Sequence, residues 1–289
     1  MAAYETLEAR FREINDLEHA AAILSWDEAT MMPPESGDVR ASALATLAGV
    51  MHQKMTEPET GDLIRQLGTE SPSLDHWQTA NLREMRRRWQ HAVAVPADLV
   101  IATSRANSLC EQTWRRCRAD NDWKTIAPLL AEVTRLAREN AICLGEAGAI
   151  APYDALMDYW EPGLRAHDVD IIFNDLKSFL PPLIDAVIGK QAIEPPLPLP
   201  GPFPIDRQRR LATTLMERLG FDTSRGRLDV SHHPFCGGVR DDTRITTRYA
   251  ESEFLGALMA VLHETGHALY QQGLPGDWSR QPVGDALGM

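Results

Sequence analysis

The sequence lacks several features that would assign it to a specialised class of protein. It has no apolar run of about 18 residues, which argues against a membrane-spanning helix. Its first residues, MAAYETLEARFRE, form neither a secretory signal nor a transit peptide. Basic residues are outnumbered, 29 against 41 acidic ones, and the net charge of −12 argues against nucleic acid as the main partner. We therefore expect a cytoplasmic protein that binds neither membranes nor nucleic acid.

Cysteine is also scarce, and its spacing is uninformative for metal binding. The four cysteines are far apart and form no C-x-x-C pair, which argues against a zinc ribbon or a thioredoxin motif. In a reducing compartment we expect free, buried thiols at Cys110, Cys117, Cys143 and Cys236. The length of 289 residues, with 44% hydrophobic and 24% charged residues, is typical of a soluble globular chain with one large domain or two ordinary ones.

Residues 1–190 show the periodicity of helices. Tyr4, Leu7, Phe11 and Ile14 recur at three- and four-residue steps, as on one apolar helix face. Similar stretches cover about 73–95, 97–119, 126–145 and 167–190, with proline and Gly/Asp/Asn clusters between them. The pattern predicts a helical N-terminal region over 1–190.

A proline-rich segment follows the helical region. Residues 181–204 carry eight prolines, which predicts an extended connector, densest over 191–204. The alternative is a proline-rich ligand for a partner domain. Residues 205–289 then form a second region. It starts with a helix over about 205–220 and ends with a helix over about 251–272. Between these helices, RLDVSHHPF and VRDDTRITTRY predict two extended segments around a Gly-Gly turn.

The last predicted helix contains His263-Glu264-Thr265-Gly266-His267. Histidines four residues apart project from one helix face, so their imidazoles can converge on one metal ion. Glu264 is turned by about 100° from His263 and lies beside the ion, where it can take a proton from water. This is the H-E-x-x-H arrangement of zinc peptidases. The alternative is a pair of core histidines that hydrogen-bond to neighbouring side chains. Gly266 allows another group to approach the helix closely, or is simply a tolerated glycine.

Longer motifs carry a resemblance to a known family. HETGHALYQQGLP resembles the motif helix of the Taq-type thermostable metallocarboxypeptidases. His233-Pro234-Phe235 resembles the HPF motif of that family, and Asp242–Thr246 resembles its DxRxT motif. SWDEATMMPP at 25–34 and YDALMDYWEPG at 153–163 resemble two further signatures. These motifs follow the order of the family and span nearly the whole chain.

The resemblance implies a mainly α, groove-forming, zincin-like fold with a small β-hairpin or sheet beside the HExxH helix. It also implies removal of C-terminal residues from peptides, a zinc or cobalt ion, and a homodimer. By position, His263 and His267 would be metal ligands and Glu264 the general base. Arg244 would bind the substrate carboxylate, with Asp242 and His233 nearby. The alternative for Arg244 is a structural ion pair with Asp242, two residues away on one strand face.

The third zinc ligand of this family is a glutamate from a later HES-type motif. Only 22 residues follow His267 here and none is a glutamate, so the resemblance predicts truncation before the third ligand. Asp285 is a weaker substitute. One interpretation is half of a split peptidase, completed by another chain or by a partner subunit. Others are an inactive truncated homologue that acts as a binding protein, or an unrelated helical protein with a chance motif. We expect exposed apolar helix faces to cause self-association or to bind a partner.

Overall fold

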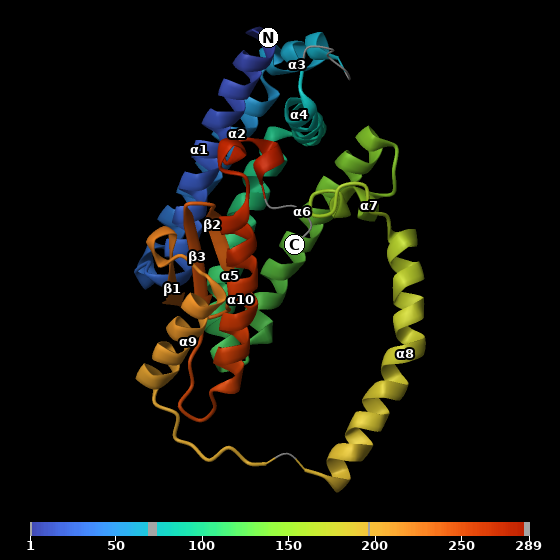
Figure 1. The fold of residues 1–289 in the computed structure, drawn as a ribbon. Helices are drawn as coiled ribbons and strands as arrows, with labels where there is room; N and C mark the ends of the chain where they lie inside the picture. The colour runs from blue at the N-terminus through green and yellow to red at the C-terminus, as the bar shows by residue number, and fades with distance from the viewer. Residues whose placement is uncertain (1, 69–73, 196, 286–289) are drawn as a thin grey trace.

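The computed structural model describes residues 2–68, 74–195 and 197–285 (Figure 1). Over these residues the protein is mainly helical and contains one small sheet, which packs beside the helix that carries the HExxH motif. The predicted fold class is therefore confirmed. No helix among the described residues is both long enough and apolar enough to span a bilayer. All four cysteines are free, as predicted.

The elements follow one another with short connections. The helices are α1 (Ala2–Thr30), α2 (Gly37–Thr56), α3 (Pro58–Leu67), α4 (His76–Ala94), α5 (Ala97–Asp120), α6 (Trp123–Gly148), α7 (Pro152–Met157), α8 (Ala166–Ile193), α9 (Ile205–Leu219) and α10 (Leu255–Gly273). The strands are β1 (Gly226–Val230), β2 (Cys236–Val239) and β3 (Asp242–Thr247). The predicted helices therefore occur close to their expected ranges, although Ser73, where one was expected to begin, lies outside the described residues.

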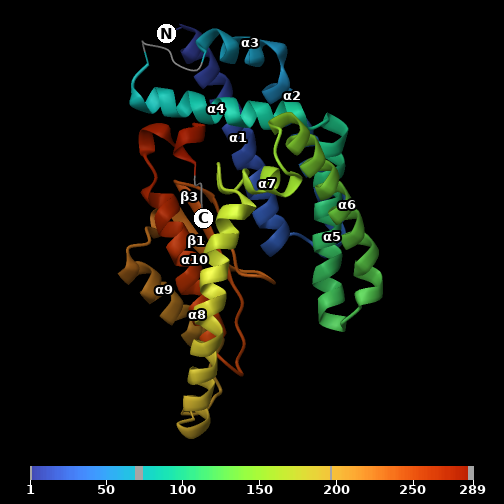
Figure 2. The same cartoon turned by 90° about the vertical axis from the view of Figure 1, so that its right-hand side faces the viewer.

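The first core lies where α1, α3 and α4 meet. The apolar stripe predicted on the first helix is buried there, and Tyr4, Leu7, Phe11 and Ile14 are each no more than 1% exposed. Met85 of α4 packs into the same cluster. Figure 2 shows α4 crossing α1 near the amino end of the chain, with α5 and α6 side by side beyond it. This body holds α1 in place, and the carboxyl end of α1 reaches the sheet.

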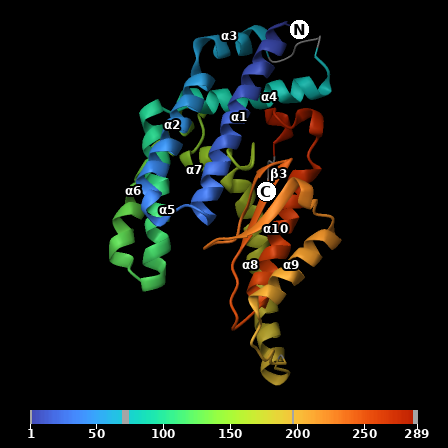
Figure 3. The ribbon, with the colours of Figure 1, turned by 90° about the vertical axis from the view of Figure 1, so that its left-hand side faces the viewer.

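The second core joins the sheet to α9 and α10. Ile245 of β3 and Val261 of α10 are fully buried, and they pack with Ala268 and Met216. Successive side chains of a strand alternate between its faces, so Asp242 and Arg244 point away from α10. Figure 3 shows the sheet beside α1, with α9 and α10 beyond it. The sheet therefore separates α1 from the HExxH helix.

The topology of the sheet differs from the predicted hairpin. The strand order is β1-β3-β2, with β1 parallel to β3 and β2 antiparallel to it. Gly237 and Gly238 were expected to form the turn, but they lie within β2, and the turn is at Arg240–Asp241. Gly238 has φ +97°, and a Cβ there would lie 2.1 Å from the Asp242 carbonyl oxygen. Glycine is therefore required just before the turn, and this explains why its position was mistaken for the turn itself.

The helix predicted over about 167–190 is confirmed. α8 continues through Pro181 and Pro182 to Ile193, three residues into the connector predicted over 191–204. A proline removes one backbone donor, and on this exposed helix water can satisfy the freed carbonyls. Neither helix nor strand covers the described part of 195–204, while Pro196 lies outside the described residues. The division into 1–190, 191–204 and 205–289 stays a prediction.

After α10 the chain returns to the amino-terminal helices. The fully buried Asn81 of α4 donates to Gln281 Oε1 (3.1 Å) and to Tyr4 Oη (3.1 Å), and its Oδ1 accepts from the Val283 backbone N–H (3.2 Å). Arg280 forms an ion pair with Asp16. The segment after the HExxH helix is thus fixed against α1 and α4.

Candidate metal centre

The two histidines of the HExxH motif lie next to each other on α10. Their Nε2 atoms are 3.2 Å apart, their ring centroids are 4.8 Å apart, and the rings are inclined at 79°. His263 is exposed and His267 half-buried. A rotation of 100° per residue places His263 about 200° around the helix from the buried Val261. The imidazoles therefore project away from the sheet, as two ligands of one ion would.

This spacing can be compared with the geometry of a zinc site. Zinc–nitrogen bonds of 2.0–2.1 Å at a tetrahedral angle place two ligand nitrogens about 3.3 Å apart. The observed 3.2 Å between the Nε2 atoms agrees with that value. His263 and His267 thus fit two of the ligand positions. The alternative of a buried pair satisfied by other side chains does not fit, because His263 is exposed and the two imidazoles contact each other.

Glu264 occupies a different environment from the histidines. Its residue is only 7% exposed, and it lies on the flank of α10 that faces β2. Burial, together with the negative charge of Glu264, raises the pKa of the Cys236 thiol to about 12. Cys236 therefore stays protonated at neutral pH beside the carboxylate. The sequence indicated only a small buried residue at Cys236, because the electrostatic effect of Glu264 on it links two separate elements.

No third ligand completes the centre within 2–68, 74–195 and 197–285, where no group of three His, Cys, Asp or Glu side chains could hold a metal ion. Asp285, the substitute considered from the sequence, instead forms an ion pair with Arg88 of α4, near Glu18. Burial raises the pKa of the Asp285 carboxyl against the opposing effect of Arg88. The described residues therefore bring together two imidazoles and a neighbouring carboxylate.

Gly266 lies within the motif on the exposed surface of α10. A Cβ built at this position would meet no heavy atom within 4 Å among the described residues. The close approach considered from the sequence is therefore absent from the described part of the chain. Gly266 is a tolerated glycine there.

The DxRxT segment meets the N-terminal signature on the other face of the sheet. Arg244 Nε and Nη2 donate to the two carboxylate oxygens of Asp242 at 2.9 and 3.0 Å. The guanidinium of Arg244 also lies 4.2 Å above the ring of Trp26. His19 Nε2 lies 3.4 Å from Asp242 Oδ2. The structural ion pair considered from the sequence is thus present, and it packs against α1.

The HPF and DxRxT segments are also joined to each other. Thr246 Oγ1 accepts a hydrogen bond from Phe235 N (3.0 Å), and Thr246 N donates to Phe235 O (2.8 Å). The side chain of His233 is exposed, and its carbonyl accepts from Ser231 Oγ (2.6 Å). Thr246, fully buried, therefore fixes the loop that carries His233. Its role was missed because the motif shows which residues occur but not which hydrogen bonds they make.

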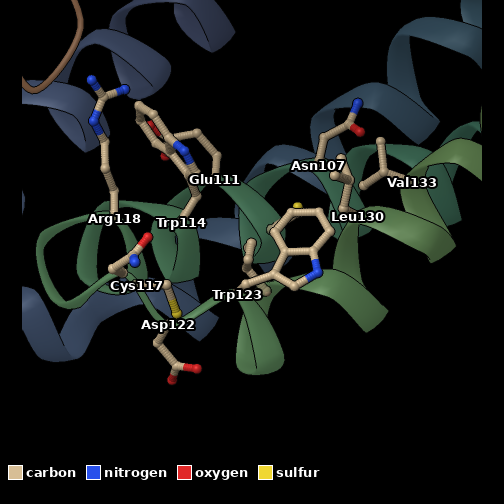
Figure 4. Close-up of a pocket in the computed structure, with 12 residues that line it drawn as sticks. Asn107, Glu111, Trp114, Cys117, Arg118, Asp122, Trp123, Leu130 and Val133 are labelled. Atoms are coloured by element: carbon tan, nitrogen blue, oxygen red, sulfur yellow. The ribbon is translucent and has the colours of Figure 1, made fainter.

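Two cavities help to delimit the site. One of about 560 Å³ lies between α1, α2, α5 and β2, and its lining includes Trp26, Glu28 and Phe235. The cavity in Figure 4, of about 530 Å³, lies between α5 and α6, where Trp114 and Trp123 contribute to its wall. None of the residues that line the second cavity comes from the sheet or α10. The first cavity therefore borders the motif-bearing part of the protein, and the second does not.

An HExxH motif on a helix whose opposite face packs on a small sheet is an arrangement typical of zinc peptidases. The sequence comparison assigns the family. Residues 6–289 match the family described as carboxypeptidase Taq (M32) metallopeptidase. The chain belongs to this family.

Individual relatives show how much of the chain is shared. Thermostable carboxypeptidase 1 of Thermus thermophilus is 37% identical, over 100% of this chain and 58% of its own length. The structure of Trypanosoma cruzi metallocarboxypeptidase 1 is 39% identical with a TM-score of 0.87, over 99% of this chain and 58% of its own. The M32 carboxypeptidase of Deinococcus radiodurans R1 is 30% identical with a TM-score of 0.83, over 99% and 57%. This chain therefore spans somewhat more than half the length of these relatives.

Proposed function

We propose that this chain carries the catalytic helix of a zinc metallocarboxypeptidase, which hydrolyses the last peptide bond of a peptide substrate. The observation that carries the proposal is the 3.2 Å separation of His263 Nε2 and His267 Nε2, with Glu264 as the neighbouring residue on the same helix. This arrangement provides two metal ligands and a base within one helical turn. Membership of the metallopeptidase family supports the same chemistry.

The residues of the chain divide the chemistry between them. When bound, zinc supplies a Lewis acid and lowers the pKa of water to about 7. Glu264 takes the proton of the attacking water and delivers it to the amine that leaves. Packing of α10 against the sheet fixes the position of Glu264, because Val261 and Ala268 of the same helix are fully buried.

The third ligand of the proposed centre comes from outside the described residues. Two imidazoles alone hold zinc, or the alternative cobalt, weakly, so we propose that this chain alone is impaired as an enzyme. A complementing C-terminal chain would supply the missing group, and a homodimer is the other proposed assembly. The competing proposal is an inactive homologue that acts through binding. The missing third ligand is the single observation that favours it.

The substrate-binding role of Arg244 is constrained by the ion pair. Asp242 accepts hydrogen bonds from Nε and Nη2, so a substrate carboxylate would have to use Nη1 or displace Asp242. In this proposal Asp242 and Arg244 orient the strand, and His233 contacts the peptide from its exposed loop. The proposed partner is thus a peptide with a free C-terminus, in the cytoplasm.

Zinc content and peptide hydrolysis test the proposal. We expect the chain to bind less than one zinc ion tightly at micromolar zinc, and His263→Ala to abolish the remaining binding. Addition of a complementing C-terminal region should give stoichiometric zinc and release of C-terminal residues. Glu264→Gln should then keep the zinc but lower hydrolysis by about 10²–10⁴-fold. A completed, zinc-loaded complex without peptide hydrolysis would favour the inactive binding protein.

A further inference from the structure

The cavity of about 560 Å³ between α1, α2, α5 and β2 has a buried hydrogen-bond donor in its wall. Trp26 of α1 lines this cavity and is only 9% exposed, and its indole N–H has no hydrogen-bond partner within the described residues. The guanidinium of Arg244 lies on the ring of the same side chain and helps to hold it in place. A buried donor without an acceptor costs free energy. The cavity therefore favours a ligand that offers an oxygen acceptor to Trp26.

A buried carboxylate lines the same cavity. Glu28 is 7% exposed, and Ser108 Oγ (2.6 Å) and Gln112 Nε2 both donate to its Oε1. Both of these donors are neutral. Arg115 lies close by, but it donates to the carboxylate of Glu111 and to the backbone carbonyl of Glu28. Because a buried charge is costly unless an opposite charge pairs with it, Glu28 favours a ligand that carries a positive charge.

An organic cation fits this cavity better than a metal ion. Hard metal cations take about six or more oxygen ligands, and no group of three His, Cys, Asp or Glu side chains within the described ranges could hold a metal ion. Leu44 and Met51 of α2, which lies beside α1 in Figure 3, and Phe235 supply apolar walls. The volume lies within the range of roughly 300–1,000 Å³ that is usual for small-molecule sites. An ammonium group on an apolar body meets these conditions.

Trp26 and Glu28 stand at opposite edges of the wall that α1 contributes. A rotation of 100° per residue places them about 160° apart around the helix, and Ser25 and Ala29 line the cavity between them. One ligand atom cannot reach both side chains, so the ligand needs its ammonium and its acceptor at separate places. The free amino end of a peptide has this form, because it combines an ammonium, apolar side chains and carbonyl oxygens further along the chain.

We propose that this cavity binds the free amino end of a short apolar peptide. The ammonium lies against Glu28, the first side chains pack on Leu44 and Met51, and a peptide carbonyl accepts a hydrogen bond from Trp26 Nε1. A water molecule can pair with the indole N–H, but it cannot neutralise Glu28. That the bound peptide is also the one hydrolysed rests on the proposed function.

Two ligands that differ by one charge test the proposal. Leucyl-leucinamide carries a free amine and no carboxylate, so its binding does not depend on a carboxypeptidase centre. N-acetyl-leucyl-leucinamide keeps the same apolar body but is neutral. In calorimetric titrations with a metal chelator present, we expect the acetylated ligand to bind at least about tenfold more weakly, because it loses the charge-assisted contact with Glu28. Equal affinities, or no binding of leucyl-leucinamide, would overturn the proposal.

A matched pair of variants assigns the charge effect to Glu28. Glu28→Gln keeps the size of the side chain and an oxygen that accepts from Ser108. Its affinity for leucyl-leucinamide should fall at least about tenfold, whereas that for the acetylated ligand should change less than about twofold. Glu132→Gln removes the same charge from the exposed surface of α6 and should leave both affinities unchanged. Equal losses in the two variants would refute the role of Glu28. The comparison of the two ligands on the unmodified protein decides the proposal even if Glu28→Gln does not fold.

The indole N–H of Trp26 reports on the other end of the ligand. Its resonance can be identified by its loss in Trp26→Phe. In the saturated complex with leucyl-leucinamide the resonance should shift, and its hydrogen exchange should slow at least about tenfold, because the N–H gains an acceptor. Trp123, which is 65% exposed and lines the cavity between α5 and α6, is the control and should not change. An unchanged Trp26 resonance would overturn the proposed contact.

Binding and hydrolysis can fail independently. If leucyl-leucinamide binds as expected but the zinc-loaded protein releases no C-terminal residues, the inference about the cavity stands and the proposed function fails. If C-terminal residues are released while free and acetylated ligands bind equally, the inference fails alone. If both hold, acetylation of a short peptide substrate should raise KM about tenfold and leave kcat unchanged. An unchanged KM would overturn the link between the cavity and the substrate.

Discussion

The helices α8 and α10 are both rich in apolar residues, yet they lie in opposite environments. In α10, Val261 and Ala268 are fully buried against the sheet and α9, which lie close to it in the sequence. In α8 no residue is buried. The difference shows that an apolar face predicts a need for a packing partner. It does not tell whether that partner belongs to the same stretch of chain.

A similar contrast exists between the two faces of α10 itself. Glu264 is 7% exposed on the flank beside β2, whereas His263 is exposed one residue earlier. The buried face fixes the helix, and the open face presents the two imidazoles that are the proposed metal ligands.

The contrast between the buried core and α8 predicts that truncating a core side chain lowers the free energy of unfolding far more than truncating an apolar side chain of α8. Ile245→Ala should lower the free energy of unfolding by about 2–5 kcal/mol, because Ile245 is fully buried between the sheet and α10. Leu183→Ala should change it by less than about 0.5 kcal/mol, because Leu183 is 44% exposed. Urea unfolding followed by circular dichroism measures both. Comparable losses would mean that α8 packs against the chain after all.

The sequence predicted the helices well because their signal is local. Three- and four-residue steps are visible in any window of the chain, as for Tyr4, Leu7, Phe11 and Ile14. The pairing in the sheet could not be predicted in this way. Parallel β1–β3 pairing places Leu228 beside Ile245 although β2 lies between the two strands in the sequence, and no local pattern encodes it. The helix predicted over about 167–190 includes Pro181 and Pro182, and an exposed helix can tolerate the loss of two backbone donors.

The candidate site was also predictable where its residues are close in sequence, and not where they are far apart. His263, Glu264 and His267 lie within one helical turn, so their spacing alone places them together. His19 and Asp242 are 223 residues apart, and only the fold brings them within 3.4 Å. The stacking of Arg244 on Trp26 is of the same kind. Motif order could suggest that these segments are related, but it could not show that they lie on the face of the sheet away from α10.

The segment after α10 also contrasts with α8. It is hydrogen-bonded to α1 and α4, whereas no residue of α8 is buried, so substitutions in the two regions should differ in their effect on stability. Asn81→Ala should cost about 2–3 kcal/mol, since it removes two donated hydrogen bonds and leaves the Val283 N–H unpaired. Asn174→Ala on the exposed face of α8 should be nearly neutral. Thermal unfolding and hydrogen exchange over 276–285 measure the effect. Unchanged exchange there would contradict the anchoring role of Asn81.

Weakening the contact between α1 and β3 should lower the free energy of unfolding by a smaller amount, and this amount should depend on pH. Arg244→Lys keeps the charge but loses the two-point hydrogen bonding to Asp242 and the stacking on Trp26, at a cost of about 1 kcal/mol near neutral pH. The hydrogen bonds from Arg244 hold the pKa of the Asp242 carboxyl below its usual 3.8. A lowered folded-state pKa stabilises the fold above the unfolded value, and this stabilisation disappears as the pH falls through the folded value.

The difference in free energy of unfolding between the wild type and Arg244→Lys should therefore be largest near pH 6 and become smaller below about pH 4. Urea titrations at several pH values measure it. Arg135→Lys is the control, because Arg135 pairs with Glu132 and Glu139 on the exposed surface of α6 and should show no measurable change. A gap that widens in acid would mean that Asp242 is not the carboxylate involved.

The smallest expected effect concerns the thiol beside Glu264. Because the thiolate is the reactive form, a pKa of about 12 predicts very slow alkylation of Cys236 by iodoacetamide at pH 8. Glu264→Gln removes one of the two causes of this shift, so the pKa should fall and alkylation should become a few-fold faster. Burial, the larger cause, would remain. Cys143, also half-buried, is the control and should react at the same rate in both proteins. If the substitution left the alkylation rate of Cys236 unchanged in mass-spectrometric time courses, the carboxylate of Glu264 would have to point away from β2, toward the open face that carries the histidines.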